Sequence, residues 1–246
     1  TTNGLELSHG VLLQDVANNN TVTNNTIRTQ GSGGSNFGIW LSNPSSGNLV
    51  SGNVITTNGT DSNTGVRLGA FANNNNVTNN TIRAQGSGNS NLGIYLSGSL
   101  GNLVSGNTIT TNGTSDNYGV RLQSSAHNNT LMSNNITTVG TGSYGVFITG
   151  SNGSVFNNTI LSNPVQWIFT DISTNNTFVN TSFVTLNSTV RFGGTLNAST
   201  GFNVTRTKFN LSFNSVFLNS TNLTFMNASA EITLNGLSFN DPRIIV

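Results

Sequence analysis

The sequence has no cysteine, little charge and no long apolar run, and each absence excludes a class of protein. Without cysteine there can be neither a disulfide framework nor a thiolate metal site. The 246 residues include eight basic and seven acidic residues, too few for the basic face that nucleic-acid binding needs. No apolar segment approaches the roughly 18 residues of a membrane-spanning helix. We therefore expect no nucleic-acid partner and no membrane span.

The polar residues that are present are almost all neutral. Charged residues make up 6% of the chain, compared with about a quarter of an ordinary globular domain. Asparagine, serine and threonine together account for nearly half of it. Such a composition can indicate disorder. Regular spacing of the apolar residues argues against disorder here.

The sequence repeats with a period of about 27 residues. A glycine followed by a β-branched residue recurs at Gly10, Gly38, Gly65, Gly93, Gly119 and Gly145. Two asparagine series share this period: Asn20, Asn48, Asn75, Asn102 and Asn129, and then Asn25, Asn53, Asn80, Asn107, Asn134 and Asn158. The unit reads G-[IV]-x-[LI]…N-x-[VL]-x-x-N-x-I. Alternate units are the most alike, since residues 47–60 and 101–114 differ at one position.

Each unit contains three short strand-like pieces, for example residues 38–41, 49–51 and 54–57. They are too short and too glycine-bounded to be helices. Short strands at a long fixed period predict a solenoid whose coils stack about 4.8 Å apart. The asparagines would then form hydrogen-bonded ladders at the corners, as stacked amides do in cross-β structures. The aliphatic positions would face the interior.

Over residues 10–160, the motif N-x-[IV]-x-x-N-x-I resembles the NosD-type repeats of the pectin-lyase-like superfamily. The resemblance implies an all-β, right-handed parallel β-helix with about 26–28 residues per coil in the first two thirds, and an extracytoplasmic setting. Polysaccharide lyases and hydrolases, periplasmic accessory proteins, adhesins and surface-layer proteins share this fold. The resemblance therefore implies no activity.

The composition changes after Pro164, where glycine becomes rarer and phenylalanine more frequent. We expect regular coils over residues 1–164 and shorter, phenylalanine-rich coils over residues 165–246. A small β-sandwich over residues 165–246 is the alternative. The chain ends in the apolar stretch DPRIIV, which we expect to be a strand. Either another segment follows it in the natural protein, or this strand pairs with something. Neither end shows a capping helix.

The sequence offers little for catalysis. Asp61 and Asp116 occupy related loops two coils apart, GTDSN and GTSDN, at a backbone separation of roughly 10 Å. No third acid joins them, whereas glycoside hydrolysis needs two carboxylates close together. His9 and His127 have no metal-ligand spacing and are expected to be ordinary turn residues. We expect no catalytic residue, no metal and no cofactor.

The third position of G-[IV]-x-[LI] points outward and alternates in chemistry. After Leu12, its occupants are Trp40, Arg67, Tyr95, Arg121 and Phe147. This column can be a self-stacking ladder that stiffens one sheet. It can also be a contact surface for another subunit or partner, or a glycan-binding surface, because Trp, Tyr and Arg are common interface anchors.

Glycosylation sequons are dense in the second half. Nine of the eleven asparagines between 175 and 227 begin N-x-[ST]: Asn175, Asn180, Asn187, Asn197, Asn203, Asn210, Asn219, Asn222 and Asn227. Asn58 and Asn112 are further candidates. Dense N-glycosylation would suit a cell-surface protein, particularly of the archaeal type.

Together these features favour an extracellular structural or adhesive cell-surface glycoprotein. Its partners would be covalent N-glycans and other copies of itself, assembled end to end or laterally into a filament, sheath or surface layer. The alternative is a β-helix protein that binds or degrades polysaccharide.

Overall fold

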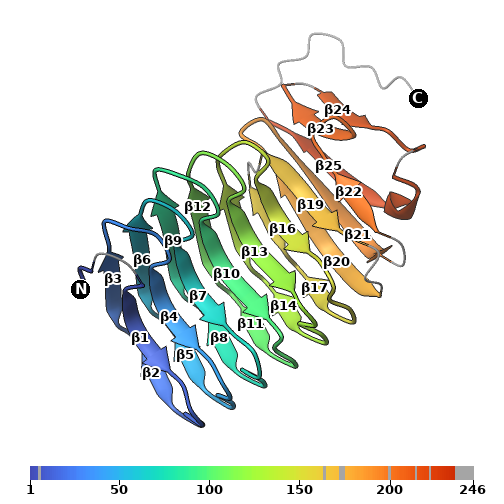
Figure 1. Cartoon of the computed structure of the whole chain (residues 1–246). Coiled ribbons are helices and arrows are strands. Elements are labelled where there is room, and N and C mark those ends of the chain that lie inside the picture. Colours follow the sequence, from blue (N-terminus) through green and yellow to red (C-terminus); the bar gives the residue numbers. More distant parts are fainter. Residues whose placement is uncertain are drawn as a thin grey trace.

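The computed structural model describes residues 1–4, 7–162, 165–171, 175–198, 201–213, 215–221 and 223–235. Its strands wind into a β-solenoid whose coils stack in order along the chain (Figure 1). The described residues contain one 3-10 helix, η1 (Thr224–Met226), and no α-helix. No helix among them is long and apolar enough to span a membrane. The prediction of an all-β parallel solenoid is confirmed.

Each full coil contributes one strand to each of three columns, and neighbours within a column are parallel. The first column is β1 (His9–Leu13), β4 (Phe37–Leu41), β7 (Thr64–Leu68), β10 (Leu92–Ser97), β13 (Tyr118–Gln123), β16 (Tyr144–Ile148) and β19 (Gln166–Thr170). The second is β2 (Thr21–Thr23), β5 (Leu49–Ser51), β8 (Asn76–Thr78), β11 (Leu103–Ser105), β14 (Thr130–Met132) and β17 (Val155–Asn157). The third is β3 (Thr26–Gln30), β6 (Val54–Gly59), β9 (Thr81–Gly86), β12 (Thr108–Asn112), β15 (Asn135–Thr138) and β18 (Ile160–Ser162).

The two predicted asparagine ladders form at the corners between columns. The backbone N–H of Asn75 donates to Asn102 Oδ1 at 2.9 Å, and Asn75 Nδ2 donates to the same oxygen at 3.3 Å. The same pair of bonds joins Asn80 to Asn107. These amides are buried, so the ladder satisfies polar groups that water cannot reach. The expected continuation at Asn158 is wrong. Strand register places the next residue, Thr159, after Asn134 instead.

The structure contains a third ladder that was not predicted from the sequence. It runs through Asn36, Asn63, Asn91, Asn117 and Ser143. Each of these residues stands two positions before the repeated glycine, so the pattern N-x-G-[IV] would have revealed it. Three amide columns therefore hold the coils in register.

The repeated glycine and isoleucine interlock inside the solenoid. A Cβ atom on Gly93 would collide with Ile109 Cγ2 of its own coil and with Gly119 O of the next. The equivalent glycines meet isoleucines in the same way, for example Gly38 with Ile55. The motif therefore pairs glycine with isoleucine because the backbone must come close to that side chain.

The two-coil period has its cause at a corner. Asn74 (φ 54°) and Gly101 (φ 64°) occupy the same left-handed corner in successive coils. A Cβ on Gly101 would lie 2.6 Å from Asn74 Oδ1. An outward asparagine therefore excludes a side chain at this corner one coil later. Asparagine and glycine alternate as a result, which explains why residues 47–60 recur at 101–114.

The last coil is shorter, and the winding then stops. Val146 pairs with Ile168, 22 residues on, so the shortening begins within residues 1–164, where coils of 26–28 residues were expected. β20 (Asn176–Val184) pairs with both β17 and β18. It includes the corner between these two columns, where Asn180 (φ 49°) takes the left-handed conformation that Asn158 (φ 48°) has one coil earlier.

After β20 the strand direction reverses. Thr185 Oγ1 accepts a hydrogen bond from Ser188 N in the turn, and β21 (Ser188–Ala198) then pairs antiparallel with β20. β22 (Phe202–Val204) pairs antiparallel with β19, and β25 (Ala230–Leu234) with β21, while β23 (Phe209–Ser212) and β24 (Ser215–Leu218) form a hairpin. Beyond residue 184, the described residues form an antiparallel cap and not the expected further coils. Because β21 and β22 extend the solenoid's own sheets, the alternative of a separate sandwich does not fit either. The expected strand at 241–246 lies outside the described residues.

Candidate functional site

The outward column of the first sheet brings together residues that are 22 to 28 positions apart in sequence. Strand register aligns Leu12 with Trp40, and the alignment continues through Arg67, Tyr95, Arg121, Phe147 and Phe169. We call Trp40, Arg67, Tyr95, Arg121 and Phe147 the aromatic–arginine stripe. Its members succeed one another at the inter-coil spacing of about 4.8 Å.

Within the stripe, each arginine lies between two rings. The Arg67 guanidinium carbon is 5.0 Å from the centroid of Trp40 and 5.3 Å from that of Tyr95. The Arg121 carbon is 5.6 Å from Tyr95 and 5.7 Å from Phe147. Such contacts contribute about 0.5–1 kcal/mol each at exposed sites. Tyr95 is therefore enclosed by two cations, and both guanidinium groups are held in place.

A second row of rings flanks the stripe, and the sequence reading missed it. His9 stacks on Phe37 at 5.2 Å, and Tyr118 stacks on Phe147 at 4.4 Å. The expectation that His9 is a turn residue is wrong, because it lies in β1. Burial lowers the pKa of His9, and the charge of Arg67 acts in the same direction. This second row could have been predicted from the sequence, because the residue before each repeated glycine is often aromatic.

A hollow of about 220 Å³ opens beside the two arginines. Three serines in left-handed turns border it, Ser35, Ser62 and Ser90. The remaining lining residues are Phe37, Thr64, Arg67, Leu92, Tyr95 and Arg121. The hollow therefore combines hydroxyl groups with two guanidinium groups.

Neither stripe arginine has an anionic partner within the described part of the chain. The Nε atoms of Arg67 and Arg121 are buried and have no hydrogen-bond acceptor. The buried Nε1 of Trp40 lacks one as well. Buried donors normally find an acceptor, because an unmade hydrogen bond costs about 1–3 kcal/mol. These three unpaired donors make the stripe the candidate functional site.

The two loop aspartates do not form a carboxylate pair. Asp61 Oδ1 accepts a hydrogen bond from the backbone N–H of Asn89, one coil on. Asp116 Oδ1 accepts one from the hydroxyl of Tyr118, at 3.4 Å. Burial, with the negative charge of Asp116, raises the pKa of Tyr118 to about 12, so the phenol keeps its proton at neutral pH. Asp116 thus adds a negative charge near the Arg121 end of the hollow.

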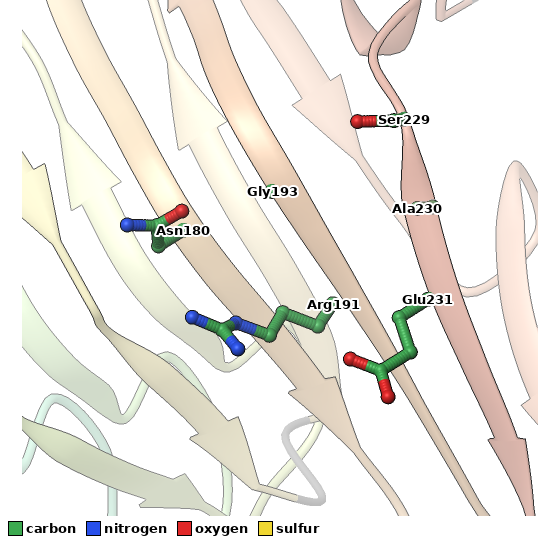
Figure 2. A pocket seen from close by; sticks show the side chains of 6 residues that line it. All are labelled: Asn180, Arg191, Gly193, Ser229, Ala230 and Glu231. Atoms are coloured by element: carbon green, nitrogen blue, oxygen red, sulfur yellow. The ribbon is translucent and has the colours of Figure 1, made fainter.

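A second hollow, of about 460 Å³, lies on the cap (Figure 2). Arg191 of β21 and Glu231 of β25 are directly opposite each other, and their side chains extend to the same side. Asn180 faces them from the irregularity in β20. The lining contains a single carboxylate, so it offers no acid–base pair.

The predicted glycosylation sites differ in exposure. Asn58, Asn112, Asn175, Asn197 and Asn227 are exposed, whereas Asn180, Asn187, Asn203, Asn210 and Asn219 are half-buried. Asn203 also accepts a hydrogen bond from the Tyr144 hydroxyl at 3.1 Å. Asn222 lies outside the described residues.

Metal donors are scattered. No group of three or more His, Cys, Asp or Glu side chains that could hold a metal ion occurs among the described residues. His127 Nδ1 accepts a hydrogen bond from the backbone N–H of Asn152, so this nitrogen is already engaged.

Comparison with known proteins agrees with the fold. Searches of curated proteins and of solved structures each found no match. One family model, described as periplasmic copper-binding protein (NosD), matches residues 61–189. This stretch covers more than half of the chain and includes most of the solenoid, the start of the cap and both stripe arginines, Arg67 and Arg121. The chain therefore belongs to the NosD family.

Proposed function

We propose that this chain is a structural and adhesive protein of the periplasm or the cell surface. In this proposal the solenoid is a rigid scaffold, and the aromatic–arginine stripe is its contact surface. The observation that carries the proposal is the pair of stacked arginines, Arg67 and Arg121, whose buried Nε atoms lack an acceptor. The terminal N–H groups of the same guanidiniums are not among the buried atoms, so a partner's oxygen atoms can bind there.

Copper, which the family description names, does not enter the proposal. The soft and imidazole ligands that copper prefers are cysteine, methionine and histidine. This chain has no cysteine, two histidines and two methionines; His127 uses its Nδ1 in a hydrogen bond, and Met226 is buried in the hydrophobic core. The described residues supply no cluster of donors, so they do not fit a copper centre.

The surroundings of the two loop aspartates, Asp61 and Asp116, also favour a binding protein over an enzyme. Asp61 accepts a hydrogen bond from Asn89 of the next coil and Asp116 accepts one from the Tyr118 hydroxyl, so each carboxylate is engaged in a structural contact. We therefore propose a non-enzymatic protein. Turnover of any polysaccharide that is abolished by Asp116→Asn would contradict this.

N-glycosylation is part of the proposal. The five exposed sequon asparagines, Asn58, Asn112, Asn175, Asn197 and Asn227, are the positions where a glycan meets least obstruction. Intact mass spectrometry of protein from its native source tests it. A mass equal to that of the bare polypeptide would exclude N-glycans.

The stripe itself is tested by a matched pair of double variants. Arg67→Gln/Arg121→Gln removes two charges from the stripe. Arg28→Gln/Arg83→Gln removes two charges, also two coils apart, from the exposed third column. We expect the stripe variant alone to lose binding to a panel of polysaccharides and to isolated cell envelopes. Equal binding by both variants would overturn the proposal.

Lateral self-assembly is a second candidate. The low charge of the chain favours it, because copies repel one another weakly. The antiparallel cap covers the strand edges of the last coil and therefore favours lateral over end-to-end contact. Sedimentation velocity across a concentration series, with electron microscopy of the same samples, tests this. A monomer at every concentration would exclude it.

A further inference from the structure

The spacing of the two stripe arginines defines a repeat. Arg67 and Arg121 both align with Tyr95 of the coil between them, so they are separated by two coil spacings, roughly 10 Å. Stacking on rings above and below restricts both guanidinium groups. The stripe therefore presents two positive charges at a set distance along the solenoid axis.

The stacking also decides which atoms remain available. Each guanidinium carbon has an aromatic ring on the coil before and on the coil after it, at 5.0 and 5.3 Å for Arg67 and at 5.6 and 5.7 Å for Arg121, so we expect further contacts at the N–H groups. Those N–H groups form a planar fork that matches the two oxygens of a carboxylate or sulfate. Neither fork has such a partner in the described part of the chain.

The same geometry argues against neutral ligands and nucleic acids. Single-stranded nucleic acids bind by stacking their bases on free aromatic faces. Tyr95 has a guanidinium group near its ring on both sides, at 5.3 and 5.6 Å, so its faces are taken. Hydroxyl groups of Ser62 and Ser90 border the hollow between the arginines and suit the hydroxyls of a sugar.

A second copy of the chain fits the stripe less well. The protein has seven acidic residues, and two stripes facing each other would oppose like charges. A partner that carries anionic groups is therefore the better complement.

We propose that the stripe binds a linear polysaccharide that carries a carboxylate or sulfate group on alternate sugars. The polymer lies along the solenoid axis in the hollow, with one anionic group on Arg67 and the next on Arg121. This inference rests on the proposed adhesive function and names its ligand class.

Asp116 opposes the ligand at one end. Its carboxylate is held by the Tyr118 hydroxyl, and the Tyr118 ring lies 5.6 Å from the Arg121 guanidinium carbon. Replacing Asp116 by asparagine keeps a residue that tolerates its left-handed backbone (φ 53°). Asp116→Asn should therefore strengthen binding, by about two- to fivefold.

The test uses hyaluronate oligosaccharides, in which alternate sugars carry a carboxylate. A tetrasaccharide with two carboxylates should bind at least about tenfold more tightly than a disaccharide with one, because each charged hydrogen-bond pair contributes about 1.5–3 kcal/mol. Arg67→Gln and Arg121→Gln should each abolish this difference, and Arg67→Lys should retain part of it. Arg28→Gln/Arg83→Gln should leave it unchanged. Titration calorimetry at low ionic strength measures all of these, and melting curves check that the variants are folded.

Other probes separate the possible outcomes. Keratan sulfate, which carries sulfate without carboxylate, distinguishes the two anionic groups, since binding of only one polymer identifies the group preferred. Neutral dextran bound as tightly as hyaluronate, or binding unaffected by either glutamine variant, would overturn the polyanion proposal. If dextran binding were lost in Tyr95→Ala, the adhesive function would stand while its anionic ligand would not. Loss of self-association alone in the stripe variants would overturn both in favour of lateral assembly.

Discussion

The coils of the solenoid and the antiparallel cap beyond residue 184 fill their interiors in different ways. In the coils, like residues stack on like residues, as Val66, Ile94 and Val120 do, all fully buried. Where the cap packs on the last coil, most rings meet edge to face, as Phe183 of β20 does with Trp167 at 5.2 Å and with Phe209 at 5.0 Å, although Phe202 and Phe225 stack at 3.9 Å. The interior of the solenoid therefore repeats the same layer of side chains in each coil, whereas the packing in the interior of the cap does not repeat.

The difference follows from strand direction. Parallel coils at about 4.8 Å place equivalent positions over one another, so aliphatic side chains and amides of one kind stack well. Antiparallel strands in the cap place different residue types next to one another. The core there is close-packed only if the shapes of these side chains fit together. Phe156 and Phe178 mark the junction, because they still stack face to face, at 4.6 Å, across the last parallel pair.

The largest expected effect lies in the cap core. Phe183→Ala removes a fully buried ring that contacts Trp167, Phe192 and Phe209, and should lower the free energy of unfolding by about 3–5 kcal/mol. Phe217→Ala is the control, since that ring is 51% exposed and should cost little. Urea denaturation measures both. Equal losses would mean that the cap is not packed as the contacts indicate.

The next effect concerns the amide ladders of the coils. Asn75→Ala leaves the buried N–H groups of Asn48 and the carbonyl of Ser45 without partners, which should cost about 3 kcal/mol. The neighbouring Asn76→Ala removes an exposed side chain and should change stability by less than about 0.5 kcal/mol. Denaturation of the two variants side by side tests the ladder. A small loss in Asn75→Ala would show that water or repacking replaces it.

A glycine pair then separates the two regions directly. A Cβ in Gly93→Ala would press on Ile109 and on the next coil, and should cost about 1–3 kcal/mol. In Gly193→Ala, in the cap, the nearest atom is Ser229 Oγ at 4.0 Å, so stability should change by about 0.5 kcal/mol or less. Thermal melting compares them. The comparison fails if the cap variant is the more damaged one.

The smallest effect is a pH dependence at the first coil. Burial lowers the pKa of His9 in the folded protein below the ordinary 6.5. The unfolded chain then binds more protons as the pH falls below 6.5, so this part of the stability is present above 6.5 and is lost toward the folded pKa. His9→Gln should flatten the stability curve in that window. An unchanged curve would show that His9 is protonated without penalty.

Much of the solenoid could be predicted because its information is local and repeated. The period, the inward aliphatic positions and the outward column follow from spacing alone, and the structure confirms the solenoid and the buried positions. The third ladder at Asn36 had a readable signal that was overlooked. The second row of rings, with His9 and Phe37, was harder to predict. A Cβ at Gly38 would point toward Ile55 in the interior, so the regular alternation of inward and outward side chains along the strand does not hold there.

By itself, the sequence determined that like residues stack, how far apart the coils repeat and which columns face outward. Where the winding ends was decided only in the tertiary structure, because the turn after Val184 reverses the chain and β21 then pairs antiparallel with β20. The unpaired state of Arg67 and Arg121 was likewise decided there. A period describes what each coil shares with the next, whereas a missing partner depends on everything that surrounds a side chain.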